Sequence, residues 1–510
     1  MSDSRVKNSA HNMVTGFMYH GLTLILSFVS RTVFIQTLGR EYLGLNGVFS
    51  DVLTLLSMAD LGFNTAMAYS FYKPLADNDQ KTITSLVAFY KKVYNFIALA
   101  VAVLGLLCVP FLKYIINTET EIPNLEIYYL CSLAGIVISY LFVYKTTILT
   151  ADQKNYMVVW VSIWTSIIKT VLQIASLLIL KNYIVYLVIG IVIQFINNFV
   201  ASKQAEKTYP YIMNKANVGK VDKELTDGIW KNMKSVFIYK FSGTMFSATD
   251  NIIISIVVGT AMVGIYSNYL MISSKLLLII QIIFSSITAS IGNIIAKESA
   301  KKKYEVFTAM QSASYIMCGV ITSAFCLLSN DLMEVWLGSD FKVSTLTIIA
   351  ITLNTYFSCV LLPLWIYRDA TGLYIKTKYV ALAGAILNIG LSFLLGHFLG
   401  IAGIILATSI SRVCTYFWYE PKVLFKEYFE HSAVKYYFQL FFNLILVAVT
   451  ITGLGFLTSK LEVHSWPTLI LKGFIIGVVC CIVFMLAYCR TEGFKIISNR
   501  ILSIFKKKEK

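Results

Sequence analysis

Long apolar runs alternate with short polar segments along nearly the whole chain. A membrane-spanning helix needs roughly 20 mostly apolar residues, and the hydropathy pattern predicts fourteen such spans. They cover residues 12–38, 44–71, 83–110, 127–150, 156–180, 183–202, 235–258, 264–290, 306–329, 343–367, 379–396, 400–419, 436–458 and 467–489. The expected fold class is therefore an all-α polytopic membrane protein.

The connections between the spans predict two lobes of six helices and a final pair of helices. The longest connection, residues 203–234, would join an N-terminal lobe (1–202) to a C-terminal lobe (235–419) as a cytoplasmic linker, and residues 420–510 would add the last two spans and a basic tail. Four apolar residues of the linker share one helical stripe: Val221, Leu225, Trp230 and Met233. The linker is expected to form either an interfacial helix or a solvated connection.

Composition and charge agree with a membrane protein. The chain is 57% hydrophobic and 14% charged, whereas soluble domains are about 45–50% apolar and about 25% charged. The net charge of +16 would also suit a nucleic-acid-binding protein, but the basic residues lie in connections between spans, so membrane topology explains them better and no nucleic-acid partner is expected.

The basic residues concentrate in alternate connections, which predicts the orientation. With the N-terminus inside, the cytoplasmic segments are 1–11, 72–82, 151–155, 203–234, 291–305, 368–378, 420–435 and 490–510. They include the runs Lys301–Lys303 and Lys506–Lys508, whereas the outer connections hold Arg40, Lys113, Lys181, Lys342 and Lys460. Both termini are therefore expected in the cytoplasm.

Two short stretches, LGREYLG and VGTAMVG, predict an internal repeat. The glycines are five residues apart in each, Gly39 and Gly44 in the first and Gly259 and Gly264 in the second. Polar residues precede the first glycine of each stretch at matching depths. His20 lies nineteen residues before Gly39, and Lys240 nineteen before Gly259. Arg31 lies eight residues before Gly39, and Asp250 nine before Gly259. This is weak symmetry of the kind found in transporters built from repeats, and here the two repeats would be parallel.

Ionisable side chains at membrane depth are the candidate functional residues, because they rarely face lipid. Asp51 lies near the depth of Arg31, and Lys275 near that of Asp250, which predicts one ion pair in each half. Each pair would either fix helix register or open to bind an anionic substrate and a coupling cation.

The other charged residues at this depth extend the same hypothesis. Asp60 would couple transport to protons or sodium, or serve a hydrogen-bonded structural role. Lys169 and Arg412 lie deep enough to line a cavity, and such a cation-rich interior suits a substrate that carries phosphate. Pro363 should kink the tenth span.

The sequence shows no motif that indicates metal binding, nucleotide binding or hydrolytic catalysis. The nine cysteines show no metal-ligand spacing, and no P-loop, Ser/His/Asp arrangement, dinucleotide fingerprint or HEXXH motif is present. His397 and His464 are isolated, which disfavours a membrane-embedded glycosyl- or acyltransferase. We expect a non-enzyme without metal or cofactor, driven by a proton or sodium gradient, the membrane potential or substrate flow.

Three stretches of the sequence carry a resemblance to a known family. They are RTVFIQTLGREYLGLNGVFSDVLTLLSMADLGFNTAMAYSFYKPLADND, TDNIIISIVVGTAMVGIYSNY and YRDATGLYIKTKYVALAGAILNIGLSFLLGHFLGIAGIILATSISR. The last contains Arg368, Gly372, Asn388, Gly400 and Gly403 in familiar positions. Over most of the first twelve spans, the chain resembles the polysaccharide transport family, the Wzx-like repeat-unit flippases of the MOP exporter superfamily.

The resemblance implies two six-helix lobes around a central cationic cavity in a bacterial plasma membrane. The implied substrate is an undecaprenyl-pyrophosphate-linked oligosaccharide, flipped to the outer leaflet by alternating access for capsular or exopolysaccharide synthesis. Spans 13 and 14 would help form a groove for the lipid tail. Polysaccharide polymerase and glycosyltransferases would be partners.

Two relatives in the same superfamily stay as alternatives. Lipid II flippases also have fourteen spans, and multidrug antiporters usually stop at twelve. The family does not fix its substrate contacts in sequence, so depth and charge select the candidates. The substrate-binding candidates are Arg31, Lys240, Lys275, Arg412, Lys169 and His20, and the coupling or gate candidates are Asp51, Asp60 and Asp250.

Overall fold

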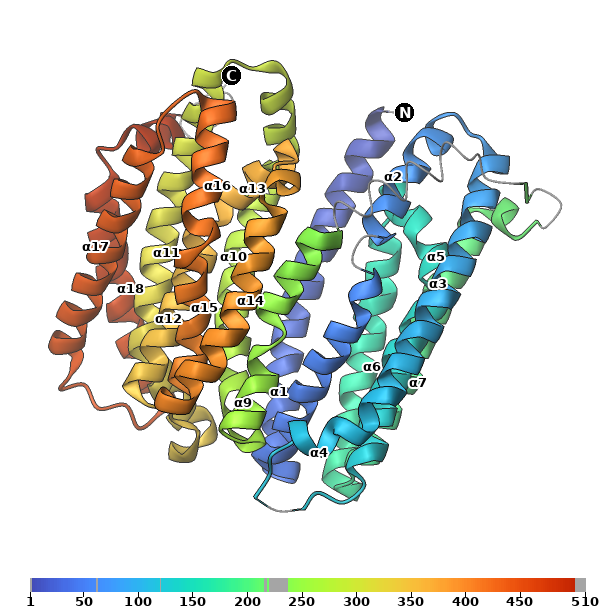
Figure 1. Ribbon diagram of the computed structural model, residues 1–510, viewed down its shortest axis with the longest axis horizontal. Helices are drawn as coiled ribbons and strands as arrows, with labels where there is room; N and C mark the ends of the chain where they lie inside the picture. Colours follow the sequence, from blue (N-terminus) through green and yellow to red (C-terminus); the bar gives the residue numbers. More distant parts are fainter. Residues whose placement is uncertain (1, 61–62, 120, 215–217, 220–236, 500–510) are drawn as a thin grey trace. The chain divides into compact units, whose positions relative to one another are not determined.

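The computed structural model describes residues 2–60, 63–119, 121–214, 218–219 and 237–499 (Figure 1). These residues form helices and connections with no β-strand, which confirms the all-α expectation. Eleven of the described helices are long and apolar enough to cross a membrane, or twelve when one bent pair counts as a single span. The predicted number of fourteen spans is therefore not confirmed. The predicted linker stripe and the lysines of the C-terminal tail lie outside the described residues.

The chain divides into two compact units, residues 1–264 and 265–510. The first unit extends past the predicted linker and includes the start of the second repeat. Its helices are α1 Ser2–Leu56, α2 Phe63–Ala76, α3 Gln80–Cys108, α4 Leu112–Ile115, α5 Leu125–Ala151, α6 Tyr156–Leu180, α7 Tyr183–Thr208 and α9 Asp250–Val257. Within this unit α1 packs on α6, and α7 packs on both α5 and α6 (Figure 1).

The second unit continues α10 Thr260–Lys297, which begins at the end of the first unit. Its other helices are α11 Ala300–Leu337, α12 Thr345–Val360, α13 Leu362–Thr371, α14 Tyr374–Leu399, α15 Ile401–Cys414, α16 Tyr416–Leu424, α17 Val434–Thr458 and α18 Trp466–Tyr488, with a π-helical segment at Phe425–Phe429. Helix α11 is central to this unit, because α12, α17 and α18 all pack on it (Figure 1).

Several predicted spans are interrupted, which is one reason that counting helices gives fewer than fourteen. In the predicted second span, α1 ends at Leu56, a short 3₁₀ turn covers Ser57–Asp60, and α2 starts at Phe63. The predicted seventh span is a helix at 237–247, a bend, and then α9. Helices α12 and α13 meet at 43°. Pro363 lies at the start of α13, where its missing N–H does least damage, and it accounts for the predicted kink.

A buried polar network attaches the last two helices to α11. Asn443 of α17 is fully buried and donates hydrogen bonds to the Tyr488 hydroxyl of α18 at 2.8 Å and to the Tyr315 carbonyl of α11 at 3.4 Å. Its side-chain oxygen accepts from the Tyr356 hydroxyl of α12 at 3.1 Å. Since unpaired polar groups are costly in an apolar interior, this network fixes how α17 and α18 sit within the second unit.

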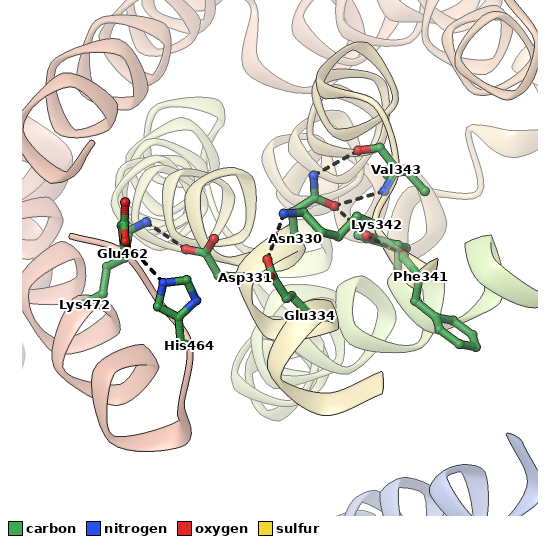
Figure 2. Close-up of polar contacts among 10 residues, drawn as sticks. Asn330, Asp331, Glu334, Phe341, Lys342, Val343, Glu462, His464 and Lys472 are labelled. Atoms are coloured by element: carbon green, nitrogen blue, oxygen red, sulfur yellow. Dashed lines mark hydrogen bonds and ion pairs between the residues drawn. The ribbon is translucent and has the colours of Figure 1, made fainter. Parts of the chain in front are cut away.

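The connection between α11 and α12 is held by one asparagine (Figure 2). The Asn330 side chain donates to the Val343 carbonyl at 2.9 Å and accepts from the Val343 N–H at 3.2 Å and from the Tyr269 hydroxyl at 2.6 Å. Lys342 pairs with Glu334 at 2.8 Å across the same turn. The turn is therefore tied to both α10 and α11.

Two contacts at one end of the first unit hold α1 and α6 together. The Asn12 side chain donates to the Gln153 carbonyl at 2.9 Å and accepts from the Tyr156 N–H at 2.7 Å. The Tyr209 hydroxyl donates to the Asp152 carboxylate at 2.6 Å, and burial together with this carboxylate raises the pKa of Tyr209. The Asn12 hydrogen bonds thus join α1, which carries Arg31, to the start of α6, which carries Lys169.

Candidate substrate-binding site

The two predicted glycine corners are present in the structure. Gly39 has φ 86° and Gly259 has φ 132°, and each interrupts a helix. Backbone angles of this kind strain residues that have a side chain. The repeated glycine therefore marks a repeated backbone turn, as the spacing predicted.

The corners contact each other reciprocally inside the first unit. A methyl group on Gly44 would lie 1.9 Å from the Thr260 carbonyl oxygen, and one on Gly264 would lie 2.0 Å from the Arg40 carbonyl oxygen. Gly44 and Gly264 hold the same position in the two repeats, as do Arg40 and Thr260. The contact is thus formed twice by equivalent residues, and both copies need a residue without a side chain because the backbones approach so closely.

Asp51 has a partner in this same interface. Its carboxylate accepts a hydrogen bond from Asn251 of α9, and the Asn251 side chain also lies beside Gly47, one helical turn before Asp51. Asn251 precedes Gly259 by eight residues, the offset by which Arg31 precedes Gly39. The sequence analysis compared Arg31 with Asp250 instead, so it missed Asn251. The predicted ion pair between Arg31 and Asp51 stays a prediction.

Arg31 lies on α1 among polar groups of α7. It is within electrostatic range of the Tyr186 hydroxyl, which itself hydrogen-bonds to Ser30. The Phe34 ring lies 5.1 Å from the Tyr186 ring in an edge-on contact. From α6, Gln173 donates to the Tyr186 carbonyl at 3.0 Å. A cation, an amide and aromatic rings from three helices therefore meet around Tyr186.

Lys169 lies one turn before Gln173 on α6 and faces Gly190 of α7. A methyl group on Gly190 would lie 3.9 Å from Lys169 Cε and 3.3 Å from the Gln173 amide nitrogen. The missing side chain at Gly190 therefore leaves room for both residues. Arg31 and Lys169 thus belong to neighbouring helices of one unit, and Gln173, which lies near Lys169, also contacts the backbone of Tyr186.

A chain of side-chain amides continues along α6 and α7. The Thr165 hydroxyl donates to the Asn197 carbonyl oxygen at 2.8 Å, and Asn197 donates to Asn198 at 3.0 Å. Gln194 also donates to Asn198, at 3.1 Å. These uncharged residues were not among the predicted site residues, all of which are ionisable. The signal was the spacing of Gln194, Asn197 and Asn198 on one side of an otherwise apolar span.

The other predicted residues of the first unit are more scattered. His20 is half-buried on α1, with the Tyr19 ring 5.7 Å from its own ring. Lys240 is half-buried in the helix at 237–247, and Asp250 is 7% exposed at the first position of α9. Asp60 lies in the 3₁₀ turn between α1 and α2, and its side chain is outside the described part.

In the second unit Arg412 lies where two helices break. It is 6% exposed near the end of α15 and donates to the Tyr416 hydroxyl of α16 at 2.9 Å and to the Ser358 hydroxyl of α12 at 3.3 Å. The Trp365 ring of α13 lies 5.8 Å from its guanidinium carbon. Broken helices of this kind supply substrate and ion sites in transporters. Lys275 is half-buried on α10 of the same unit.

A second arginine of this unit is paired with a carboxylate. Arg368 donates to both carboxylate oxygens of Glu420 at 3.1 and 3.2 Å, and the two residues are 7% and 3% exposed. Both residues were predicted in cytoplasmic connections, and in the structure both lie on helices. Helix α13 continues to Thr371, and helical structure after α16 continues to Phe429, because Phe425 and Phe429 are buried in the core.

The site residues thus form two clusters with different chemistry. In the first unit, Arg31 and Lys169 lie beside amides and aromatic rings, which suits a phosphate next to sugar hydroxyls. In the second, Arg412 is surrounded by hydroxyls and an indole, while Arg368 neutralises Glu420. Arg31, Lys169 and Arg412 supply the positive charge of the two clusters, and all three lie on helices apolar enough to cross a membrane.

Solved structures show which known fold this chain shares. The all-helical chain with its broken membrane helices has the fold of the transporters of the MOP superfamily. It is similar to the lipid II flippase MurJ in an inward closed conformation, with a TM-score of 0.62 and 16% identity over 94% of this chain and 99% of MurJ. An inward-facing multidrug resistance MATE transporter matches with a TM-score of 0.58 and 14% identity over 78% of this chain and 93% of its own.

A third solved structure agrees with these two. A mutant of the Vibrio cholerae MATE transporter VcmN matches with a TM-score of 0.55 and 13% identity, over 83% of this chain and 99% of its own. No family model and no curated protein matches the sequence. The likeness is thus one of fold.

Proposed function

We propose that the protein is a flippase for undecaprenyl-pyrophosphate-linked oligosaccharide repeat units. It would move them from the cytoplasmic to the outer leaflet of a bacterial plasma membrane by alternating access, for capsular or exopolysaccharide synthesis. Arg31, Lys169 and Arg412 would bind the pyrophosphate, with Lys240, Lys275 and His20 as further contacts. The amides of α6 and α7 would bind sugar hydroxyls, and the prenyl chain would stay in lipid.

The cluster around Tyr186 carries this proposal. Arg31 lies there beside uncharged hydrogen-bonding groups, and Lys169 lies on the neighbouring helix α6, all on membrane-spanning helices where isolated charges are costly and mark substrate pathways. A drug cation would be repelled by Arg31 and Lys169, whereas a pyrophosphate would be attracted. The proton or sodium gradient proposed as the energy source would act through Asp51, Asp60 or Asp250.

Coverage of the solved structures supports a lipid-linked substrate over a drug. The MATE transporters match 78% and 83% of this chain, whereas MurJ, described as a lipid II flippase, matches 94%. A lipid II-type substrate is therefore the second candidate, because it also joins a pyrophosphate to a sugar and a prenyl chain. A cation-coupled multidrug antiporter is the third.

The test is transport by purified protein in proteoliposomes. We expect movement of a fluorescent undecaprenyl-pyrophosphate oligosaccharide, and at least a tenfold loss in Arg31→Ala, the loss of one charge-assisted contact worth about 1.5–3 kcal/mol. Lys181→Ala, which removes an exposed lysine at the end of α6, is the matched control and should transport normally.

Three outcomes would contradict the proposal. Normal transport by both Arg31→Ala and Arg412→Ala would remove the cationic clusters from substrate binding. Faster movement of lipid II than of the oligosaccharide carrier would favour the second candidate. Proton- or sodium-coupled export of a cationic dye, without movement of either lipid, would favour the antiporter.

A further inference from the structure

A pocket of about 710 Å³ opens on the second unit where α17 begins, away from Arg412 and its partners. Tyr304 of α11 and residues 431–442 line it. The first turn of α17 contributes backbone N–H groups that have no partner within the helix. His431, Ser432 and Lys435 surround this turn with a ring nitrogen, a hydroxyl and an ammonium group. This end of the pocket offers hydrogen-bond donors and positive charge.

The structure holds His431 in place. Its ring stacks on the Tyr304 ring at 4.6 Å, and its Nδ1 lies 2.7 Å from the Phe429 carbonyl oxygen. Since a carbonyl can only accept, Nδ1 carries a hydrogen, and a second hydrogen on Nε2 makes the ring a cation that can donate to an anion. Lys435 is 62% exposed and lies 4.0 Å from Glu492, an ion pair at the limit of contact that is worth little at the surface.

Below this polar end, three apolar side chains continue the pocket. Val434, Phe438 and Phe442 recur every four residues along α17, and they are 56%, 72% and 55% exposed. They therefore form one open stripe on a helix that is apolar enough to cross a membrane. In a membrane such a stripe lies against acyl chains.

Aromatic and basic residues place the polar end at the level of lipid head groups. The Tyr437 hydroxyl donates to the Trp418 carbonyl at 2.6 Å, and the two rings lie 4.8 Å apart. Tyrosine and tryptophan are enriched at this level of a membrane. The lysine run Lys301–Lys303 directly precedes Tyr304, and lysines there attract anionic lipid.

We infer that this pocket binds one anionic phospholipid. Its phosphate would accept hydrogen bonds from Lys435, from Ser432 and from the Nε2–H of a doubly protonated His431 at the start of α17, and one acyl chain would lie along Val434, Phe438 and Phe442. The apolar stripe favours a phospholipid over free phosphate, and the lysines favour an anionic head group over a zwitterionic one. The site is independent of the proposed transport function.

The test is native mass spectrometry of the full chain in detergent, titrated with phosphatidylglycerol. The double variant His431→Ala/Lys435→Ala should bind the first phosphatidylglycerol about thirtyfold more weakly than the wild type, because it removes two cations and each cation at a membrane surface contributes about 1 kcal/mol. Lys460→Ala/His464→Ala removes the same residue types from the connection at the other end of α17 and should bind normally.

A second variant separates the acyl chain from the head group. Phe438→Gln should weaken binding of long-chain phosphatidylglycerol but not of its water-soluble short-chain form. Thermal unfolding without lipid identifies any variant that fails to fold. Binding by His431→Ala/Lys435→Ala equal to the wild type would overturn the inference. So would equal affinity for phosphatidylcholine, tighter binding of undecaprenyl phosphate, or full competition by inorganic phosphate.

Discussion

Glu420 is the carboxylate that depends most clearly on a single partner. It is 3% exposed and accepts two hydrogen bonds from Arg368. Removing one member of a buried pair typically costs about 3–5 kcal/mol, because the other charge is left in an apolar interior. We therefore expect Glu420→Leu to lower the thermal unfolding midpoint strongly, which tryptophan fluorescence of the detergent-purified protein measures.

The double variant Arg368→Met/Glu420→Leu distinguishes pairing from packing. With both charges gone, we expect most of the lost stability to return, since apolar residues often replace a buried pair at little cost. Glu427→Leu breaks the exposed pair with Lys376 and should leave the midpoint unchanged. A double variant as unstable as Glu420→Leu would contradict this account.

The sequence predicted which charged residues lie deep in the helices better than it predicted their neighbours. Burial of Arg412 and the intermediate exposure of Arg31 and Lys169 follow from their positions inside apolar runs. The contact of Asp51 with Asn251 does not, because hydropathy gives depth along a helix and not which helix lies beside it. The pairing of Glu420 with Arg368 was not predicted for a related reason, since a charged residue lowers the local hydropathy whether or not a partner neutralises it.

At the scale of helices, the two glycine corners that repeat in the sequence contact each other in the structure. Gly44 and Gly264 each face a backbone carbonyl that cannot move aside as a side chain can. We expect Gly44→Ala and Gly264→Ala each to cost about 1–3 kcal/mol, the range for overpacking, and to reduce transport. Thermal unfolding and the proteoliposome assay measure the two effects.

Gly21→Ala is the matched control for these substitutions. It lies on the same helix as Gly44, and a methyl group there would meet nothing within 4 Å. We expect it to be neutral or slightly stabilising, because alanine favours a helix over glycine. If Gly44→Ala and Gly21→Ala behaved alike, the close contact between the corners would not matter for stability.

The helices themselves were predicted closely where the apolar run was uninterrupted. Helix α6 was expected over 156–180 and covers Tyr156–Leu180. The interrupted spans were predicted as continuous, because a break at Ser57–Asp60 or at residues 248–249 leaves the average hydropathy of the segment high. The break at Pro363 was predicted, because proline lacks the backbone N–H that a continuous helix needs.

At the scale of the molecule, contacts in the first unit test the predicted order of spans. The corner after Gly39 touches Thr260, and the Thr260 N–H donates to the Asn117 carbonyl at 2.7 Å. The sequence analysis placed the Arg40 corner, the connection around Asn117 and the Gly259 corner all outside. Segments on one membrane face can touch in this way only if an even number of spans separates them. The predicted order meets this condition whether or not the total is fourteen.

The order of the spans does not determine which membrane face is outside, so the orientation is predicted from the distribution of charge. Lys302 begins α11, and Lys342 lies beyond its other end, so the two residues occupy opposite ends of one membrane helix. The excess of lysine in the connections that include Lys302 and Lys207 predicts that these lie in the cytoplasm.

In a variant without native cysteines, we therefore expect Lys342→Cys and Lys460→Cys to react with a membrane-impermeant maleimide in intact cells. Lys302→Cys and Lys207→Cys should react only after the membrane is permeabilised. The reverse pattern would invert the topology, and it would also place the start of α17 and its proposed phospholipid in the outer leaflet. Labelling of Lys302 and Lys342 from the same side would instead contradict α11 as a membrane-spanning helix.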